Sequence, residues 1–258
     1  MADDRLALDV ADGIATITIR RPQKLNALDD VMVDALAARC GAIERDATVR
    51  VVILTGEGGK AFSAGGDIEA WSGNEPQQFG MRWVRDGHAA FDCLARLRQP
   101  VIAVLNGHTL GGGLELAACA DYRIAEAHVK LGQPETGLGI IPGWSGTQRA
   151  VRRFGPQVVR RMALFGEVFA AAQALDLGLV DAVVETGQGL AKARELAASV
   201  IARAPVATEI TKMLINAADG EERERVLETL GGIAAAANED LKEGLAAFRE
   251  KRKASFKA

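Results

Sequence analysis

The sequence has few aromatic residues, little net charge and no long apolar run. Aromatic side chains make up 5% of its 258 residues, so a surface that stacks nucleic-acid bases is not expected. The formal net charge of −3 is too small to predict binding to nucleic acid or to an anionic membrane. No stretch approaches the roughly 20 consecutive apolar residues of a transmembrane helix. We therefore expect neither a nucleic acid nor a membrane as a partner.

Cysteine is also scarce. Cys40, Cys93 and Cys119 are odd in number and widely spaced, and they fit neither a disulfide framework nor a metal site. This usage favours a reducing compartment. The first ten residues, MADDRLALDV, are acidic where a secretory signal would be basic and then apolar. We expect a cytoplasmic protein with no bound metal.

The remaining composition is typical of a globular protein. Hydrophobic residues make up 48% and charged residues 25%, and the length suits one large domain or one and a half. Alternating apolar residues predict a strand at Ile14–Ile19, and an apolar run predicts a buried strand at 49–55. A helix is expected between them, at about 29–45. Strands that alternate with helices predict an α/β architecture.

A glycine-rich segment at 106–149 carries most of the chemical signals. Residues 101–105 predict a buried strand, the glycines at 111–113 a turn, and residues 114–120 a helix. Glycine lets the backbone approach a ligand closely, and a helix start presents unpaired N–H groups at its positive end. Such a turn can hold an anion or stabilise a developing oxyanion.

Two glutamates, Glu115 and Glu135, belong to this segment. Taken alone, Glu115 could face solvent or compensate the helix dipole, and Glu135 could be an ordinary loop carboxylate. Two carboxylates beside an oxyanion site are what general acid–base catalysis needs. Their spacing in the sequence does not establish that they meet.

Two stretches of the glycine-rich segment form recognisable motifs: GHTLGGGLELAACAD at 107–121 and KLGQPETGLGIIPGWSGTQR at 130–149. Together they resemble the signature region of the crotonase superfamily, also called the enoyl-CoA hydratase/isomerase family. RRPQKLNAL at 20–28, AFSAGGDI at 61–68 and EGLAAFREKRKASF at 243–256 resemble other parts of the family in the expected order. The resemblance implies an α/β fold: a crotonase-like spiral of repeated ββα units with the active site in residues 1–188, and a C-terminal helical trimerisation region in 189–258.

The resemblance also implies an enzyme, an enoyl-CoA hydratase, which adds water reversibly and syn to a trans-2-enoyl-CoA to give a 3-hydroxyacyl-CoA. Backbone N–H groups of Gly66 and Gly112 would form the oxyanion hole for the thioester carbonyl. Glu115 would hold and activate the water, and Glu135 would protonate C2. Gln133 would orient part of this site. The family pattern further implies that substrate and coenzyme A contact Lys24, Ala27, Ala64, Asp67 and Ile68.

The same resemblance bears on cofactors and partners. No metal or redox cofactor is expected, because the thioester activates the reacting carbons and coenzyme A enters as part of the substrate. The acyl-CoA is the expected ligand, and a homotrimer or a hexamer of two trimers is the expected assembly. The basic residues at 249–253 are either a solvated chain end or, together with Lys24, contacts for the phosphates or adenine of coenzyme A.

Other interpretations stay open. One is a sister reaction on an acyl-CoA, such as double-bond isomerisation or hydration of a specialised aromatic or branched enoyl-CoA. Another is a non-catalytic homologue that binds RNA, and a third is a scaffold that uses only the oligomer. The presence of both Glu115 and Glu135 favours the hydratase.

Three segments partly match known catalytic or phosphate-binding motifs but lack residues that those motifs require. The glycines at 56–60 lack the frame of a phosphate-binding loop, Ser63 has no base nearby in sequence, and the frame around Ser145 is G-x-S-G rather than G-x-S-x-G. Trp144 stands where the family more often has a small residue, which predicts a reshaped site. Ordinary core packing or an acyl pocket would explain the apolar residues Trp71, Phe79, Met81 and Trp83.

Overall fold

Two parallel-rich sheets form the framework of the protein. In the computed structural model, which describes residues 4–256, a six-stranded sheet has the order β1-β2-β3-β5-β7-β10. Its strands are β1 Leu6–Ala11, β2 Ile14–Ile19, β3 Val51–Gly56, β5 Val101–Leu105, β7 Tyr122–Glu126 and β10 Ala182–Val184. A four-stranded sheet has the order β4-β6-β8-β9, with β4 Ala61–Ser63, β6 His108–Leu110, β8 Lys130–Gly132 and β9 Val168–Ala170. Only β1–β2 and β8–β9 are antiparallel among these pairs.

The strands follow one another as repeated units. The pairs β3–β4, β5–β6 and β7–β8 each place their first strand in the six-stranded sheet and their second in the four-stranded sheet. Each pair is followed by helical segments before the next strand begins. This arrangement is the spiral of ββα units that the family resemblance implied, and it brings the C-terminal ends of β4, β6 and β8 to one edge.

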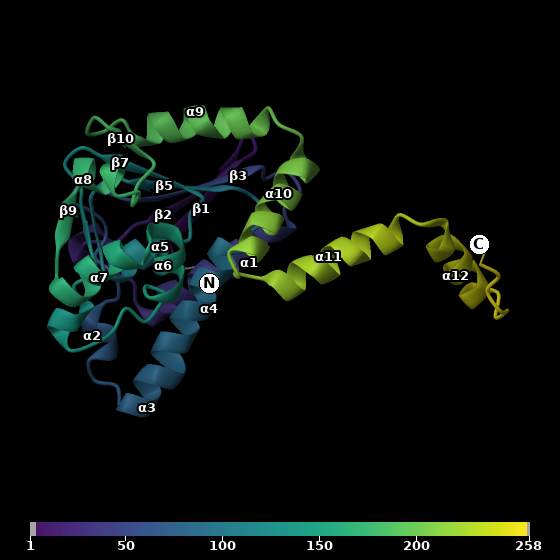
Figure 1. Cartoon of the computed structure of the whole chain (residues 1–258), viewed down its shortest axis with the longest axis horizontal. Helices are drawn as coiled ribbons and strands as arrows, with labels where there is room; N and C mark the ends of the chain where they lie inside the picture. The colour runs from purple at the N-terminus through teal and green to yellow at the C-terminus, as the bar shows by residue number, and fades with distance from the viewer. Residues whose placement is uncertain (1–3, 257–258) are drawn as a thin grey trace. The chain divides into compact units, whose positions relative to one another are not determined.

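Helices cover both faces of the six-stranded sheet, which explains why β3 and β5 are buried along their whole length. Val51 and Ile53 of β3 pack with Ala193 and Ala197 of α9 Gly189–Ile201, seen along the top of the sheet in Figure 1. The next residues along β3 face the larger core cluster on the other side. There α1 Asp30–Arg45 packs against β1 and against α4 Arg85–Ala95.

Local signals in the sequence account for the element boundaries. The predicted strand at Ile14–Ile19 is confirmed, and its burial alternates as its sequence does. The side chain of Asp29 accepts a hydrogen bond from the N–H of Met32 at 3.0 Å and so begins α1. The remaining segments of this region are η1 Pro22–Lys24, α2 Ile68–Trp71, α3 Pro76–Gln78, the π-helix η2 Phe79–Val84, α5 Gly112–Ala117, η3 Glu135–Leu138, α6 Gln148–Phe154, α7 Pro156–Phe165 and α8 Ala171–Asp176.

The chain divides into two compact units, Met1–Ile210 and Thr211–Ala258. In the first unit α9 packs on β3, β5 and β7. The boundary expected after residue 188 stays a prediction. α10 Pro205–Ala218 crosses the division, and the second unit also holds α11 Arg223–Ala236 and α12 Glu239–Arg249. The oligomerisation role assigned to residues 189–258 stays a prediction. No helix within residues 4–256 is both long and apolar enough to cross a membrane.

Candidate active site

The site is built where the segments after β4 and β6 touch. Gly65 has φ +94° and Gly111 has φ +54°, a region that favours glycine. A Cβ added to Gly65 would lie 2.6 Å from the backbone nitrogen of Gly112, so the two segments pack main chain against main chain. Gly66 follows the first turn, and Gly112 begins α5 after the second.

Both predicted oxyanion donors are available to a ligand. Gly112 is the first residue of α5, where an N–H has no intrahelical acceptor. Within residues 4–256, no hydrogen bond is found from the N–H of Gly66 or from that of Gly112. Both residues line the same pocket, and their role as oxyanion donors stays a prediction.

Glu115 lies in the first turn of α5 and is only 3% exposed. Its Oε1 accepts two backbone hydrogen bonds, from the N–H of Trp144 at 2.7 Å and from that of Gly146 at 2.6 Å. Burial raises the pKa of Glu115 to about 8, and the nearby charge of Glu135 adds to the rise. The two N–H donors and Arg149 act in the opposite direction. The carboxyl group is therefore held in a fixed orientation with a pKa close to neutral pH.

Glu135 begins η3 and is 6% exposed. Neither of its carboxyl oxygens has a hydrogen-bond partner in the described part of the chain, although both are buried. Burial raises the pKa of Glu135 to about 7. A Cβ added to Gly111 would lie 3.0 Å from Glu135 Oε1, so this carboxyl group stands against the glycine turn.

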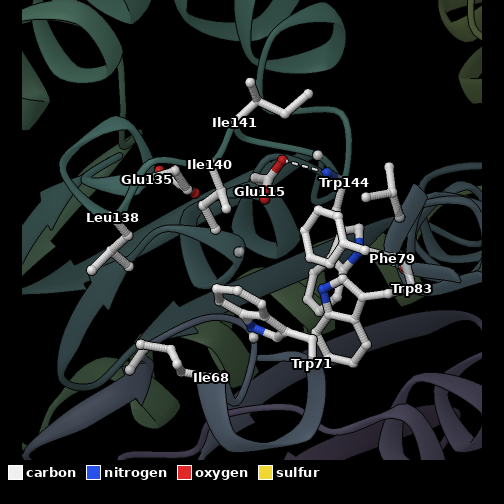
Figure 2. Close-up of a pocket in the computed structure, with 15 residues that line it drawn as sticks. Ile68, Trp71, Phe79, Trp83, Glu115, Glu135, Leu138, Ile140, Ile141 and Trp144 are labelled. Carbon is white, nitrogen blue, oxygen red and sulfur yellow. Dashed lines mark hydrogen bonds between the residues drawn. The ribbon is translucent and has the colours of Figure 1, made fainter. Parts of the chain in front are cut away.

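Both glutamates face one pocket, which has a volume of about 90 Å³. Figure 2 shows Glu115 between Glu135 on one side and Trp144 on the other. Two buried carboxyl groups that interact titrate as a pair, and near neutral pH such a pair can hold one proton. The arrangement can therefore donate a proton at one point of a ligand and accept one at another.

The pocket gathers most, but not all, of the residues that the sequence pointed to. Its lining includes six of the predicted site residues: Ala64, Gly66, Ile68, Gly112, Glu115 and Glu135. Lys24, Ala27 and Asp67 do not line it. Lys24 Nζ lies 2.6 Å from Glu69 Oε2 in an exposed ion pair, and Ala27 is buried and accepts a hydrogen bond from Arg21 through its carbonyl oxygen. Contacts of these three residues with coenzyme A stay predictions.

Asp67 has a structural use in this fold. Its carboxylate accepts a hydrogen bond from the N–H of Glu69 and begins α2, and it pairs with Arg21 at 2.7 Å. Partial burial raises the pKa of Asp67, but the bonds from Arg21 and Glu69 outweigh it and leave the pKa below its ordinary value. Asp67 therefore stays ionised and fixes the segment that follows Gly66.

Gln133 supports the loop that anchors Glu115. Its Nε2 donates to the carbonyl oxygen of Gly146 at 3.1 Å, and its Oε1 has no partner within residues 4–256. A Cβ added to Gly146 would lie 2.5 Å from Gln133 Nε2 and 2.6 Å from Glu115 Oε1. The loop at Gly146 therefore lies so close to the Glu115 carboxylate that only glycine fits there.

The two serines in motif-like surroundings have structural partners. Ser63 is fully buried, and its hydroxyl donates to the carbonyl oxygen of Asn26 at 2.8 Å. Ser145 Oγ accepts a hydrogen bond from the N–H of Arg149 at 3.3 Å, close to the start of α6. Both hydroxyls are engaged with the backbone.

The wall of the pocket is apolar. Trp71, Phe79 and Trp83 line it as one sequence interpretation allowed, whereas Met81 is 57% exposed and does not. Trp144 also lines the pocket and is 3% exposed. The sequence analysis missed a group of aliphatic lining residues: Val84, Leu138, Ile140 and Ile141. Three of these follow Glu135 in an apolar loop, which was the available signal.

No cluster of three or more His, Cys, Asp or Glu side chains within residues 4–256 is placed to hold a metal ion. The pocket itself presents two carboxyl groups, two glycine backbones and an apolar wall.

Comparison with known proteins gives consistent matches over nearly the whole chain. Residues 9–258 match the family described as enoyl-CoA hydratase/isomerase. A crotonyl-CoA hydratase of Syntrophomonas wolfei is 35% identical over 261 residues, which cover 99% of this chain and 99% of that protein. A short-chain-enoyl-CoA hydratase of Clostridium acetobutylicum is 38% identical over 257 residues, covering 97% and 96%. The crystal structure of an enoyl-CoA hydratase from Bacillus anthracis matches with a TM-score of 0.79 and 33% identity, covering 98% and 99%.

Proposed function

This chain belongs to the enoyl-CoA hydratase/isomerase family, and from that membership we infer that it is an enoyl-CoA hydratase. It adds water reversibly to a trans-2-enoyl-CoA and gives a 3-hydroxyacyl-CoA. The observation that carries this inference is the meeting of Glu115 and Glu135 in one buried pocket beside two backbone donors. The substrate is an acyl-CoA thioester.

We propose the following roles for these groups. The N–H groups of Gly66 and Gly112 donate to the thioester carbonyl oxygen, where negative charge grows as water attacks C3. One such donor is worth roughly 3–4 kcal/mol in a transition state when it is aimed at the developing charge. Because the donors are backbone atoms, they are fixed before the substrate arrives.

The two carboxyl groups divide the proton transfers. Glu115 Oε1 is held by two backbone N–H groups, so we assign Oε2 to bind the water and take its proton. Those N–H groups favour the charged form of Glu115, but burial outweighs them, and its pKa of about 8 lies above the value of about 7 for Glu135. The resting pair can therefore hold its proton on either carboxyl group near neutral pH. We assign the reactive form, with the proton on Glu135, from the family pattern. Glu135 then delivers that proton to C2, on the same face as the new C3–O bond in a syn addition. The pKa values of about 8 and about 7 suit an acid and a base that work near neutral pH.

The proposal needs no metal or redox cofactor, because the thioester carbonyl already activates C2 and C3 and the reaction changes no overall oxidation state. The orienting role of Gln133 stays a prediction. The contacts with substrate or coenzyme A also stay predictions for Lys24, Ala27, Ala64, Asp67 and Ile68. A cytoplasmic location and a homotrimer or hexamer likewise stay predictions.

The test is the loss of enoyl absorbance when the purified protein meets crotonyl-CoA. Glu115→Gln and Glu135→Gln should each lose at least about 100-fold in kcat, since general acid–base catalysis typically contributes that much or more. Glu185→Gln, which removes a glutamate at an exposed position, is the matched control and should keep wild-type turnover. Circular dichroism checks that each variant is folded.

Three results would contradict parts of this assignment. A wild type that binds crotonyl-CoA without hydrating it would refute this choice of substrate. Hydration of an aromatic or branched enoyl-CoA would then identify a specialised hydratase, and conversion of a 3-enoyl-CoA would identify the isomerase. If both glutamate variants keep wild-type turnover, the chemistry does not depend on these carboxyl groups. Salt-sensitive RNA binding by a protein inactive on all thioesters would support a non-catalytic homologue.

A further inference from the structure

Trp144 fits into a slot on a helix that runs beside the pocket. Trp83, Gly87 and Phe91 are four residues apart along η2 and α4, a spacing that places side chains on one helix face. The ring of Trp144 lies 4.9 Å from that of Trp83 and 5.0 Å from that of Phe91, centroid to centroid. Gly87 forms the floor of this slot, which we call the Gly87 slot.

The Gly87 slot holds the indole closely. A Cβ added to Gly87 would lie 2.0 Å from Trp144 Nε1, so no larger residue fits there while the indole is in place. The indole N–H donates to the carbonyl oxygen of Trp83 at 3.1 Å. An aromatic ring that is packed on two sides, hydrogen-bonded and 3% exposed is a fixed wall rather than a mobile gate.

The opposite side of the same indole faces the reacting groups. Its Cε3 lies 3.0 Å from the Cβ position of Gly112, and its Cη2 lies 3.4 Å from that of Gly66. The backbone N–H of Trp144 holds Glu115 at 2.7 Å. One residue therefore anchors a carboxyl group through its main chain and limits the space beside it through its side chain.

We propose that Trp144 determines acyl-chain specificity by ending the acyl pocket, so that the enzyme prefers short, unbranched enoyl groups of about four to six carbons. The proposal rests on the hydratase assigned above. If C2 lies at Glu135 and C3 at Glu115, the chain from C4 onward points to the side where Figure 2 shows Trp144. On that side, the indole of Trp144 occupies the Gly87 slot, which an acyl chain of more carbons would need to enter.

The size of the pocket agrees with this preference. Its volume of about 90 Å³ corresponds to about six water-sized positions, at roughly 15 Å³ for each. A small pocket of this kind favours a short acyl chain. Further methylenes would have to displace an indole that the Gly87 slot and the Trp83 carbonyl hold in place.

The first experiment measures kcat/KM for trans-2-enoyl-CoA substrates with four, six, eight and ten acyl carbons, and for cinnamoyl-CoA. Wild type should prefer the four-carbon substrate and reject the ten-carbon and cinnamoyl substrates. Trp144→Ala should raise the eight-carbon to four-carbon ratio by about 10- to 100-fold, because each buried methylene is worth roughly fourfold in binding. Trp144→Phe should give a smaller rise. Both variants keep the backbone N–H that holds Glu115.

A second pair of variants tests the Gly87 slot from the other side. Gly87→Ala should push the indole toward the pocket and lower kcat/KM for crotonyl-CoA by at least about tenfold. Gly80→Ala is the matched control in η2, since a Cβ there meets nothing within 4 Å, and it should leave crotonyl-CoA turnover unchanged. In the Trp144→Ala background, Gly87→Ala should lose its effect, because the two side chains would no longer meet.

Binding separates a failure of this inference from a failure of the hydratase assignment. Isothermal titration with butyryl-CoA and octanoyl-CoA reports the size of the pocket even if the protein hydrates nothing, and Trp144→Ala should selectively tighten octanoyl-CoA. If Trp144 had a purely structural role, its substitution would lower kcat/KM for all substrates equally and leave the ratios between chain lengths unchanged. The inference is overturned if wild type treats eight- and four-carbon chains alike, or if folded Trp144→Ala and Trp144→Phe keep wild-type ratios.

Discussion

Glu135 is a carboxyl group that folding buries without a hydrogen-bond partner in the described part of the chain. Replacing it by glutamine removes the charge and keeps the shape. Since the charged form is disfavoured in the folded protein, Glu135→Gln should stabilise the fold at alkaline pH while it removes the proposed acid. Stability and activity should move in opposite directions, which is typical of a strained catalytic group.

The magnitude follows from the pKa. Folding raises the pKa of Glu135 from an ordinary 4.5 to about 7, and at roughly 1.4 kcal/mol per pH unit this corresponds to about 3 kcal/mol. The folded state binds the proton more tightly, so wild-type stability falls as pH rises from about 4.5 to about 7 and stays low above that. At pH 8 the full destabilisation is present, and at pH 5 less than about 1 kcal/mol of it is.

The assay is urea unfolding of wild type and Glu135→Gln at pH 5 and pH 8. The difference in free energy of unfolding between Glu135→Gln and wild type should be about 2 kcal/mol larger at pH 8 than at pH 5. Desolvation of the new amide shifts this difference equally at the two pH values. Loss of the Glu135 charge also lowers the pKa of Glu115, which adds to the gain. Glu185→Gln should show no such pH dependence. A variant whose advantage does not grow between pH 5 and pH 8 would show that Glu135 is not buried as the structure has it.

Two further substitutions test the framework behind the site. Gly113→Ala should lower the free energy of unfolding, measured in urea, by about 3 kcal/mol, because its Cβ would lie 2.1 Å from the carbonyl oxygen of Ser63. Gly73→Ala is the control and should leave stability unchanged, because its Cβ would meet nothing within 4 Å. Equal stability of the two variants would contradict the contact with Ser63. Arg149→Met should lower the free energy of unfolding by about 1–3 kcal/mol, since it removes the buried guanidinium that pairs with Asp92, which keeps its ion pair with Arg96 at 2.9 Å. The double variant with Asp92→Asn should recover part of this loss. Equal stability of the single and double variants would show that the pair does not matter.

Much of the fold could be predicted because its signals are local. The strand at Ile14–Ile19 shows its burial in an alternation of apolar residues, and the start of α1 depends on one side chain three residues away. Residues 101–105 predicted a strand and residues 114–120 a helix, and β5 and α5 confirm both elements, although α5 already begins at Gly112. Motif resemblance supplied what periodicity did not show, namely the spiral and the hydratase activity.

Which elements pack against one another was harder to predict. α9 packs on β3, β5 and β7, which are far from it in the sequence. A helix pattern states that one face is apolar, but it does not state which sheet covers that face. Met81 shows the same limit, because an apolar residue near the pocket in sequence is exposed in the structure.

The sequence by itself determined which chemical groups are available: two glutamates in apolar surroundings, glycines that allow main chain to meet main chain, and a tryptophan at an unusual position. Tertiary structure decided what those groups do. Glu115 and Trp144 are 29 residues apart, and Trp144 and Trp83 are 61 apart, yet both pairs are joined by hydrogen bonds. Burial raises both pKa values and the Gly87 slot fixes the wall, and these effects arise only when distant segments exclude water together.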